Sequence, residues 1–151
     1  MCRYVWSAAV AAPLLALSIF GPSWAGAAPA ADAPKDGVFV HLTAGPEDPH
    51  RVLMALQMAN IMADSRDVLV YCDIKAIEVL LKDAPDIEYS HFPSSHEALK
   101  ALMDKKVTVM ACPGCLKAAG KTAEDLREGV KLADKDAFFD FTKGRILTLD
   151  Y

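Results

Sequence analysis

Short apolar runs alternate with helix-prone segments along the sequence from about residue 38 to its last residue. Five runs rich in β-branched, aromatic or aliphatic residues predict strands: 38–42, 68–72, 86–89, 107–111 and 145–149. Helices or helical turns are expected between them: 49–64, 74–81, 94–103, the segment that ends at Gly120, 122–127 and 134–141. Because connections of this length suit parallel strands and not hairpins, the alternation predicts an α/β fold, a three-layer α/β/α sandwich around a parallel sheet.

Capping signals mark the starts of three of these helices. Asp73 follows the second apolar run and is predicted to be the N-cap of the helix 74–81. Ser94 and Glu97 have the spacing of a capping box, which predicts a helix that runs to Met103. Thr122 is expected to cap the short helix that follows Gly120.

A parallel sheet collects functional groups at the carboxyl ends of its strands. The residues at these predicted ends are polar or nucleophilic: His41, Thr43, Cys72, Asp73, His91 and Cys112. Cys72 and Cys112 are therefore expected on one edge of the sheet, with Cys72 and His41 as auxiliary groups to Cys112. The two other interpretations are that Cys72 is a buried strand residue and that His41 bonds a loop carbonyl.

The segment Cys112-Pro113-Gly114-Cys115 carries the chemistry that we expect of this chain. It lies between the fourth predicted strand and a helix start, where free backbone N–H groups and the helix dipole favour a thiolate. The thiolate is the form of cysteine that attacks electrophiles, carries sulfur or binds metal. Cys112 is thus the predicted reactive residue, and Cys115 is the second thiol of the pair.

Three other interpretations of the cysteine pair stay open at this stage. Cys112 is also compatible with a buried structural role. The C-P-x-C spacing is typical of glutaredoxin-type redox sites, although those follow the first strand of their domain. Met110 to Cys115 also match the M-x-C-x-x-C motif that binds Cu(I) in small heavy-metal-associated domains. A Cu or Zn site would use Cys112 and Cys115, with Cys72 or His41 as a third ligand.

The N-terminal residues have the pattern of an export signal. Residues 1–25 combine Arg3, an apolar stretch and the small-residue site Ser23-Trp24-Ala25, which predicts a cleaved signal peptide. The alternative is an uncleaved anchor. Residues 26–37 predict an Ala/Pro-rich tether and 38–151 one domain. The expected location is outside the cytoplasm, in a bacterial periplasm.

Cysteine and charge counts restrict the partners. Of the four cysteines, Cys2 would leave with the signal, and the three that stay are an odd number that argues against a disulfide scaffold. Removal of Arg3 with the signal peptide leaves 15 of the 16 basic residues, compared with 20 acidic residues. A mildly acidic chain without a basic run excludes nucleic acid and a membrane surface as expected partners.

Four parts of the sequence resemble the DsrE/DsrF/TusD-like family. They are the first apolar run with Thr43-Ala44-Gly45-Pro46-Glu47-Asp48-Pro49, the second run, the run before Cys112 and the ending 144–149. The resemblance implies a five-stranded parallel sheet and assembly into homotrimers or homohexamers. It also implies that Cys112 takes up sulfane sulfur as a persulfide, as sulfurtransferase-like carriers do, from a sulfur-donor protein or a small thiol. The export signal and Cys115 set this chain apart from cytoplasmic carriers.

Three hypotheses follow. The first is an exported sulfur carrier with Cys112 as acceptor and Cys115 as resolving or auxiliary thiol, which requires no cofactor. The second is a Cu(I)- or Zn-binding module that uses the same pair. The third is a dithiol/disulfide partner in a periplasmic redox system.

Overall fold

A sheet of parallel strands forms the centre of the computed structural model, which describes residues 35–151. Its five strands are β1 (Gly37–Leu42), β2 (Asp67–Cys72), β3 (Thr108–Ala111), β4 (Val130–Leu132) and β5 (Ile146–Asp150). Their order across the sheet is β4-β3-β2-β1-β5, and every neighbouring pair is parallel. The prediction of an α/β fold with a five-stranded parallel sheet is confirmed.

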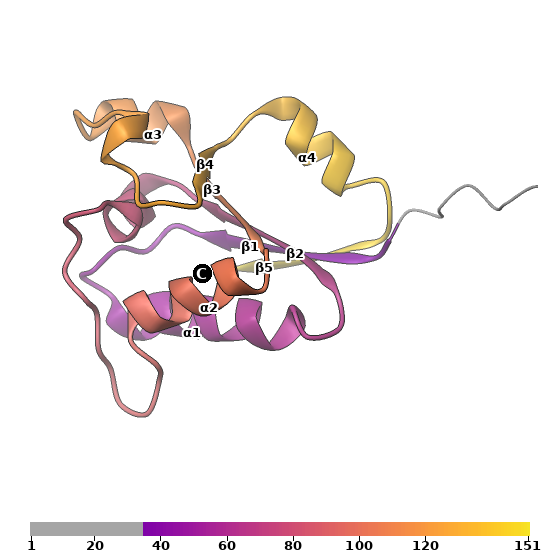
Figure 1. Ribbon diagram of the computed structural model, residues 1–151, viewed down its shortest axis with the longest axis horizontal. Helices are drawn as coiled ribbons and strands as arrows, with labels where there is room; N and C mark the ends of the chain where they lie inside the picture. The colour runs from indigo at the N-terminus through magenta and orange to yellow at the C-terminus, as the bar shows by residue number, and fades with distance from the viewer. Residues whose placement is uncertain (1–34) are drawn as a thin grey trace, which may run out of the picture. The chain divides into compact units, whose positions relative to one another are not determined.

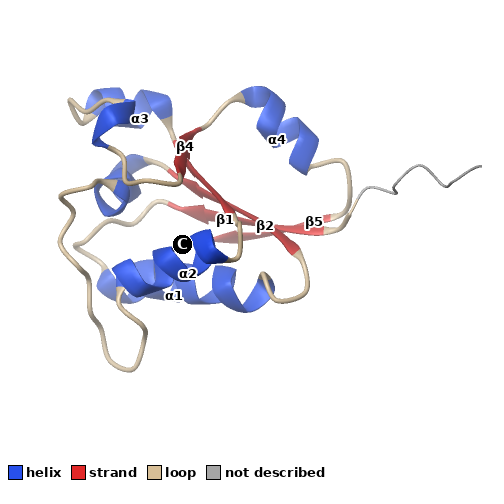
Figure 2. Ribbon diagram, viewed as in Figure 1, coloured by secondary structure: helices blue, strands red, loops and turns tan. Residues whose placement is uncertain are grey.

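Helices cover both faces of the sheet. Figure 1 shows α1 (Pro49–Met62) and α2 (Ser95–Asp104) side by side on one face, with α3 (Pro113–Ala118) and α4 (Lys135–Phe141) on the other. Two 3-10 helices, η1 (Ile74–Leu80) and η2 (Ala123–Asp125), lie in the connections after β2 and α3. The three layers are plain in Figure 2, where the strands run between the two sets of helices.

The two faces of the sheet differ in their burial. Val40 and Leu42 of β1 are fully buried, as is Leu56 of α1, and they belong to the main apolar core. Burial of each such side chain contributes about 1.5–3 kcal/mol to folding. Phe39 and Tyr71 alternate with these residues and point to the opposite face, where both rings contact Phe138 of α4. This second face is only half-buried, and it is the face that carries the site.

The capping predictions have mixed outcomes. The capping box of α2 is confirmed, because the Ser94 hydroxyl accepts from the Glu97 N–H at 3.3 Å and the Glu97 carboxylate accepts from the Ser94 N–H at 3.2 Å. Asp73 makes no side-chain capping bond, and the helix after it is the 3-10 helix η1. One carboxylate oxygen of Asp73 lies 3.1 Å from Nε2 of His41.

The predicted helix 122–127 is also shorter than expected. η2 ends at Asp125, since Leu126 forms an isolated bridge with Leu81 and the Arg127 N–H donates to the Leu80 carbonyl at 3.0 Å. These contacts tie the segment to the end of η1.

The prediction of a strand over 86–89 is wrong. Ile87 in this segment is buried, but its N–H donates to the Ser95 hydroxyl and its carbonyl accepts from the Ser95 N–H, each at 3.0 Å. The start of α2 therefore satisfies the backbone that a neighbouring strand would otherwise pair. His91 consequently follows no strand and is exposed in a loop.

Sequence analysis missed β4, which completes the five strands of the sheet. β4 comprises three residues and pairs with β3 through Val109 and Val130. Such a short strand, with Lys131 at its centre, leaves no apolar run in the sequence. Because β4 replaces the segment 86–89, the cysteine pair follows the third strand of the chain and not the fourth.

The predicted signal peptide, 1–25, lies outside the described residues, as does the tether 26–37 up to residue 34. Within residues 35–151, no helix has the length and apolar character needed to cross a bilayer.

Candidate functional site

Cys112 is the N-cap of α3. β3 ends at Ala111, the backbone of Cys112 is extended, and Pro113 occupies the first turn of the helix. In this conformation Sγ of Cys112 accepts a hydrogen bond from the Cys115 N–H at 3.4 Å. The Cys112 N–H itself donates to the Cys72 carbonyl at 2.9 Å, so the backbone is anchored to β2.

Tyr71 approaches Cys112 from β2, and its hydroxyl favours the Cys112 thiolate. Tyr71 reaches it because Tyr71 and Met110 are register partners on β2 and β3, and Cys112 lies two residues beyond Met110. Side chains two residues apart project from the same face of a strand.

These contacts favour the thiolate of Cys112. Burial alone would raise its pKa, but the effects of Tyr71, Cys115 and the Gly114 N–H together outweigh burial, and the pKa lies below its usual value. The side chain is half-buried and stays in contact with solvent. A thiol that is both acidified and accessible has the properties of a reactive cysteine.

Cys115 lies one turn further along and has the opposite tendency. The Ile74 N–H, which bonds to it, favours its thiolate. The hydrogen bond to Cys112, burial and the charges of Cys112 and Asp73 outweigh that effect, so its pKa is raised. The pair therefore combines a cysteine whose thiolate is favoured, Cys112, with one whose protonated thiol is favoured, Cys115.

The turn after β2 is strained next to this pair. Ile74 has a φ of 47°, in the left-handed region that a β-branched residue rarely adopts. Its side chain is 63% exposed, so apolar burial does not compensate for this conformation. What the turn provides is the Ile74 N–H beside Cys115.

His41 lies near the pair but acts on a different partner. Its ring stacks on Tyr71 with centroids 5.6 Å apart, and its Nδ1 lies 3.1 Å from a carboxylate oxygen of Asp150. Its Nε2 lies 3.1 Å from Asp73 without hydrogen-bond geometry, and it is buried with no hydrogen-bond partner. The imidazole on β1 thus holds the Tyr71 ring on β2 in place.

Cys72 is not brought to the pair. Its side chain is fully buried in the core, on the face of the sheet opposite to Tyr71, and burial raises the pKa of its thiol to about 12. Only its backbone carbonyl reaches Cys112. Met110 is likewise buried within β3.

Sequence analysis missed Tyr71. The signal was present: strand side chains alternate, so a core position for Cys72 places its neighbour Tyr71 on the other face, beside the thiols.

Residues 35–151, which the structure describes, contain no group of three or more His, Cys, Asp or Glu side chains placed to hold a metal ion.

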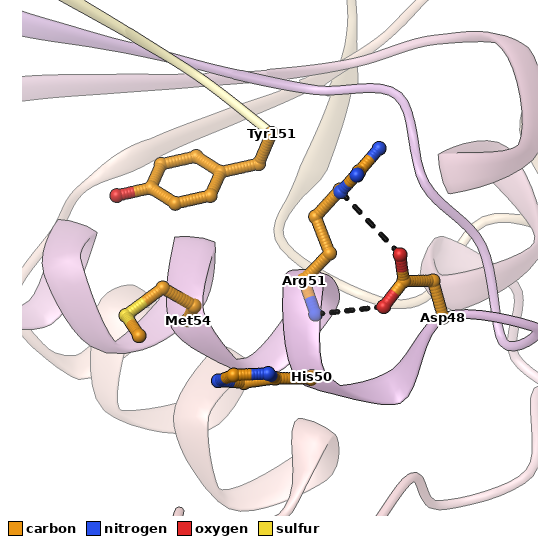
Figure 3. Close-up of a pocket in the computed structure, with 5 residues that line it drawn as sticks. All are labelled: Asp48, His50, Arg51, Met54 and Tyr151. Atoms are coloured by element: carbon orange, nitrogen blue, oxygen red, sulfur yellow. Dashed lines mark hydrogen bonds and ion pairs between the residues drawn. The ribbon is translucent and has the colours of Figure 1, made fainter.

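A separate pocket of about 230 Å³ lies beyond the carboxyl end of β5. In Figure 3 the Tyr151 ring lies above Met54, and Asp48 contacts the backbone nitrogen and the guanidinium of Arg51. His50 completes the lining, and neither Cys112 nor Cys115 belongs to it.

The fold and site define a parallel α/β protein with an acidified cysteine at the carboxyl edge of its sheet. The model of the DsrE/DsrF-like family matches residues 36–148, and the chain belongs to this family, which is generally related to sulfur relay. The family resemblance seen in the sequence is confirmed. No curated protein matches the chain.

Two solved structures share the fold. The YchN protein from E. coli superposes with a TM-score of 0.61 at 16% identity, over 76% of this chain and 99% of that one. The MTH1491 protein of unknown function from Methanobacterium thermoautotrophicum gives a TM-score of 0.59 at 24% identity, over 78% of this chain and 99% of that one. At these identities the likeness establishes the fold alone.

Proposed function

We propose that this protein carries sulfane sulfur as a persulfide on Cys112, with Cys115 as the resolving thiol. The observation that supports this most is the half-buried Cys112 thiol at the start of α3, where the Cys115 N–H donates to Sγ and the Tyr71 phenol further favours the thiolate. Membership in a family related to sulfur relay agrees with it.

Loading is a transfer between thiols. The Cys112 thiolate attacks the outer sulfur of a donor persulfide, forms a new S–S bond and displaces the donor as its thiolate. The proton of the donor persulfide stays on the transferred sulfur, so Cys112 ends as Cys–S–SH. No net oxidant or reductant is needed. The donor is a persulfide-bearing protein or a small thiol persulfide.

Release uses the second cysteine. After deprotonation, Cys115 attacks Sγ of Cys112, forms the Cys112–Cys115 disulfide and expels the outer sulfur as hydrosulfide. The two cysteines are oxidised and the sulfane sulfur is reduced, so the electrons balance. The raised pKa of Cys115 suits this order of events, because a protonated Cys115 leaves the persulfide intact until a base removes its proton. A thiol reductant then restores the dithiol.

A dithiol/disulfide redox partner is the second candidate function. The same asymmetric pair favours it, since an acidified first cysteine with a protonated neighbour also suits disulfide exchange. Cu(I) or Zn bound by Cys112 and Cys115 is a third outcome that the experiment must separate.

The intact mass of the purified protein separates these functions. Protein is measured as isolated, after glutathione persulfide, after a mild disulfide oxidant and after Cu(I). The sulfur-carrier proposal expects one added sulfur atom after the persulfide, lost in Cys112→Ser and kept in Cys72→Ala. In Cys115→Ser, which cannot form the disulfide, the carrier proposal expects the added sulfur to be retained. Loss of two hydrogens from the wild type after the oxidant, with no gain of sulfur in Cys115→Ser after the persulfide, supports the redox partner. Retained metal with no gain of sulfur supports the metal module, and either result contradicts the carrier.

Location and assembly are part of the proposal. We expect cleavage after Ala25 and export to the periplasm, with assembly into a homotrimer or homohexamer. N-terminal sequencing of protein from a periplasmic fraction and sedimentation equilibrium test these two points. An intact N-terminus in the cytoplasmic fraction, or a monomer, contradicts the respective point.

A further inference from the structure

Tyr71 lies beside Cys112, although it comes from β2, 41 positions earlier in the chain. Its hydroxyl lowers the pKa of the Cys112 thiol. The two residues project from the same face of adjacent strands, as the pairing of Tyr71 with Met110 requires. The contact is therefore built into the register of the sheet.

The Tyr71 ring is held from two sides. The His41 imidazole stacks on it at 5.6 Å and an interplanar angle of 26°, and the edge of Phe138 meets it at 5.1 Å and 80°. His41 is in turn bonded through Nδ1 to Asp150 on β5. A ring packed in this way has little freedom to turn its hydroxyl away from Cys112.

The phenol acts as a donor because it keeps its proton. Burial and the neighbouring Cys112 and Asp73 all raise the pKa of Tyr71. Cys112 therefore receives the hydrogen and does not supply it. A donor with a fixed position and a retained proton is what stabilisation of developing charge requires.

We propose that Tyr71 is a catalytic residue of this site, which donates a hydrogen bond to Sγ of Cys112 and thereby holds the attacking sulfur as an oriented thiolate, and that His41 is a positioning residue that acts through the Tyr71 ring. The proposal deepens the sulfur-carrier function and rests on it for its biological meaning. The contact itself is testable without any sulfur transfer.

Other ionisable groups face Sγ of Cys112, and their effects on its reactivity must be distinguished from the effect of Tyr71. Cys115 approaches it from α3, Asp73 lies at the end of β2, and His41 lies on β1 with Asp150 behind it. The contact from α4 is the uncharged ring of Phe138. His41 contacts the Tyr71 ring and Cys115 contacts Cys112, so the test includes variants that remove each.

The test measures the rate at which Cys112 reacts with an aromatic disulfide reagent between pH 5 and pH 10, by peptide mass. Removal of one hydrogen bond to a thiolate raises the pKa by about one unit. A thiolate with a higher pKa is also a stronger nucleophile, by about threefold for one unit at a Brønsted slope of 0.4–0.5. Tyr71→Phe is therefore expected to react about threefold more slowly well below the pKa and about threefold faster on the high-pH plateau.

This crossing of the two profiles distinguishes a hydrogen bond from a packing effect. A loosened site would expose Cys112 and accelerate its reaction at every pH. Tyr89→Phe is the matched control, since Tyr89 is exposed and lies in a loop away from the pair, and it is expected to leave the profile unchanged. Thermal unfolding of each variant verifies that the fold is retained.

Two backgrounds complete the experiment. In Cys115→Ser and in His41→Phe, which keeps a ring beside Tyr71 but no imidazole, the crossing caused by Tyr71→Phe is expected to persist. His41→Leu, which loses the stacked ring, is expected to shift the profile in the same direction as Tyr71→Phe. Superimposable profiles of Tyr71→Phe and the wild type overturn the assignment of Tyr71, and a wild-type profile in His41→Leu overturns that of His41. A crossing without any persulfide formation retains the assignment and contradicts the sulfur-carrier function.

Discussion

Replacement of Cys115 by Ser separates loading from release. The backbone N–H of residue 115, 3.4 Å from Sγ of Cys112, does not depend on the side chain, and the Tyr71 hydroxyl also stays. The change affects one side-chain hydrogen bond to Cys112, worth about 0.5–1.5 kcal/mol, and a Ser hydroxyl is able to donate in its place. The pKa of Cys112 is therefore expected to rise by no more than about one unit.

The rates that follow differ sharply between the two steps. With nucleophilicity partly offsetting the loss of thiolate, loading of Cys115→Ser from glutathione persulfide is expected within about threefold of the wild-type rate. Release of hydrosulfide is expected to fall to the level of the Cys112→Ser protein, because no second thiol attacks the persulfide. Loading is followed by intact mass and release by a hydrosulfide-selective probe. Hydrosulfide release from Cys115→Ser at the wild-type rate would refute the role of Cys115.

Two further predictions concern the core and the loop before α2. Burial raises the pKa of Cys72 from its usual 9.0 to about 12, so its contribution to stability is complete below about pH 9 and is lost as the pH rises toward 12. In urea titrations, the free energy of unfolding of the wild type relative to Cys72→Ala is therefore expected to fall by up to about 1.4 kcal/mol per pH unit above pH 9. Parallel dependences of the two proteins on pH would contradict this. Ser95→Ala leaves the buried Ile87 N–H without its 3.0 Å partner and is expected to lower the free energy of unfolding by about 1–3 kcal/mol. Replacement of the exposed Ser90 by Ala is the control and is expected to lower it by less than about 0.5 kcal/mol. Equal unfolding midpoints of the two variants would show that other contacts hold the loop.

Local pattern was enough to predict most of the fold. The strands β1, β2 and β3 are continuous apolar runs because both faces of a parallel sheet are covered, and the capping box at Ser94 marks α2. The segment 86–89 was wrongly predicted to be a strand, because the backbone of its buried Ile87 pairs with Ser95 and not with a neighbouring strand. β4 escaped notice because three residues beside an established strand need no apolar run.

The site was predictable only in its local part. Cys112 and Cys115 share one turn, so their contact follows from their spacing in the sequence. The contact of Tyr71 with Cys112 depends on β2 lying next to β3 in a particular register, and the stacking of His41 depends on β1 lying on the other side of β2. Strand order is set by the packing of the whole chain, which a single sequence does not display.

Location of the transferred sulfur is the most direct test of the central claim. The protein is treated at pH 7 with one equivalent of glutathione persulfide, trapped with an alkylating reagent, digested, and sequenced by fragmentation of the peptide that contains residues 107–117. We predict an alkylated persulfide on Cys112 with Cys115 as an alkylated thiol, and a Cys112–Cys115 disulfide without added sulfur in those molecules that have already released it. An added sulfur on Cys115 alone, or none on this peptide while the reagent modifies Cys112 readily, would contradict the account.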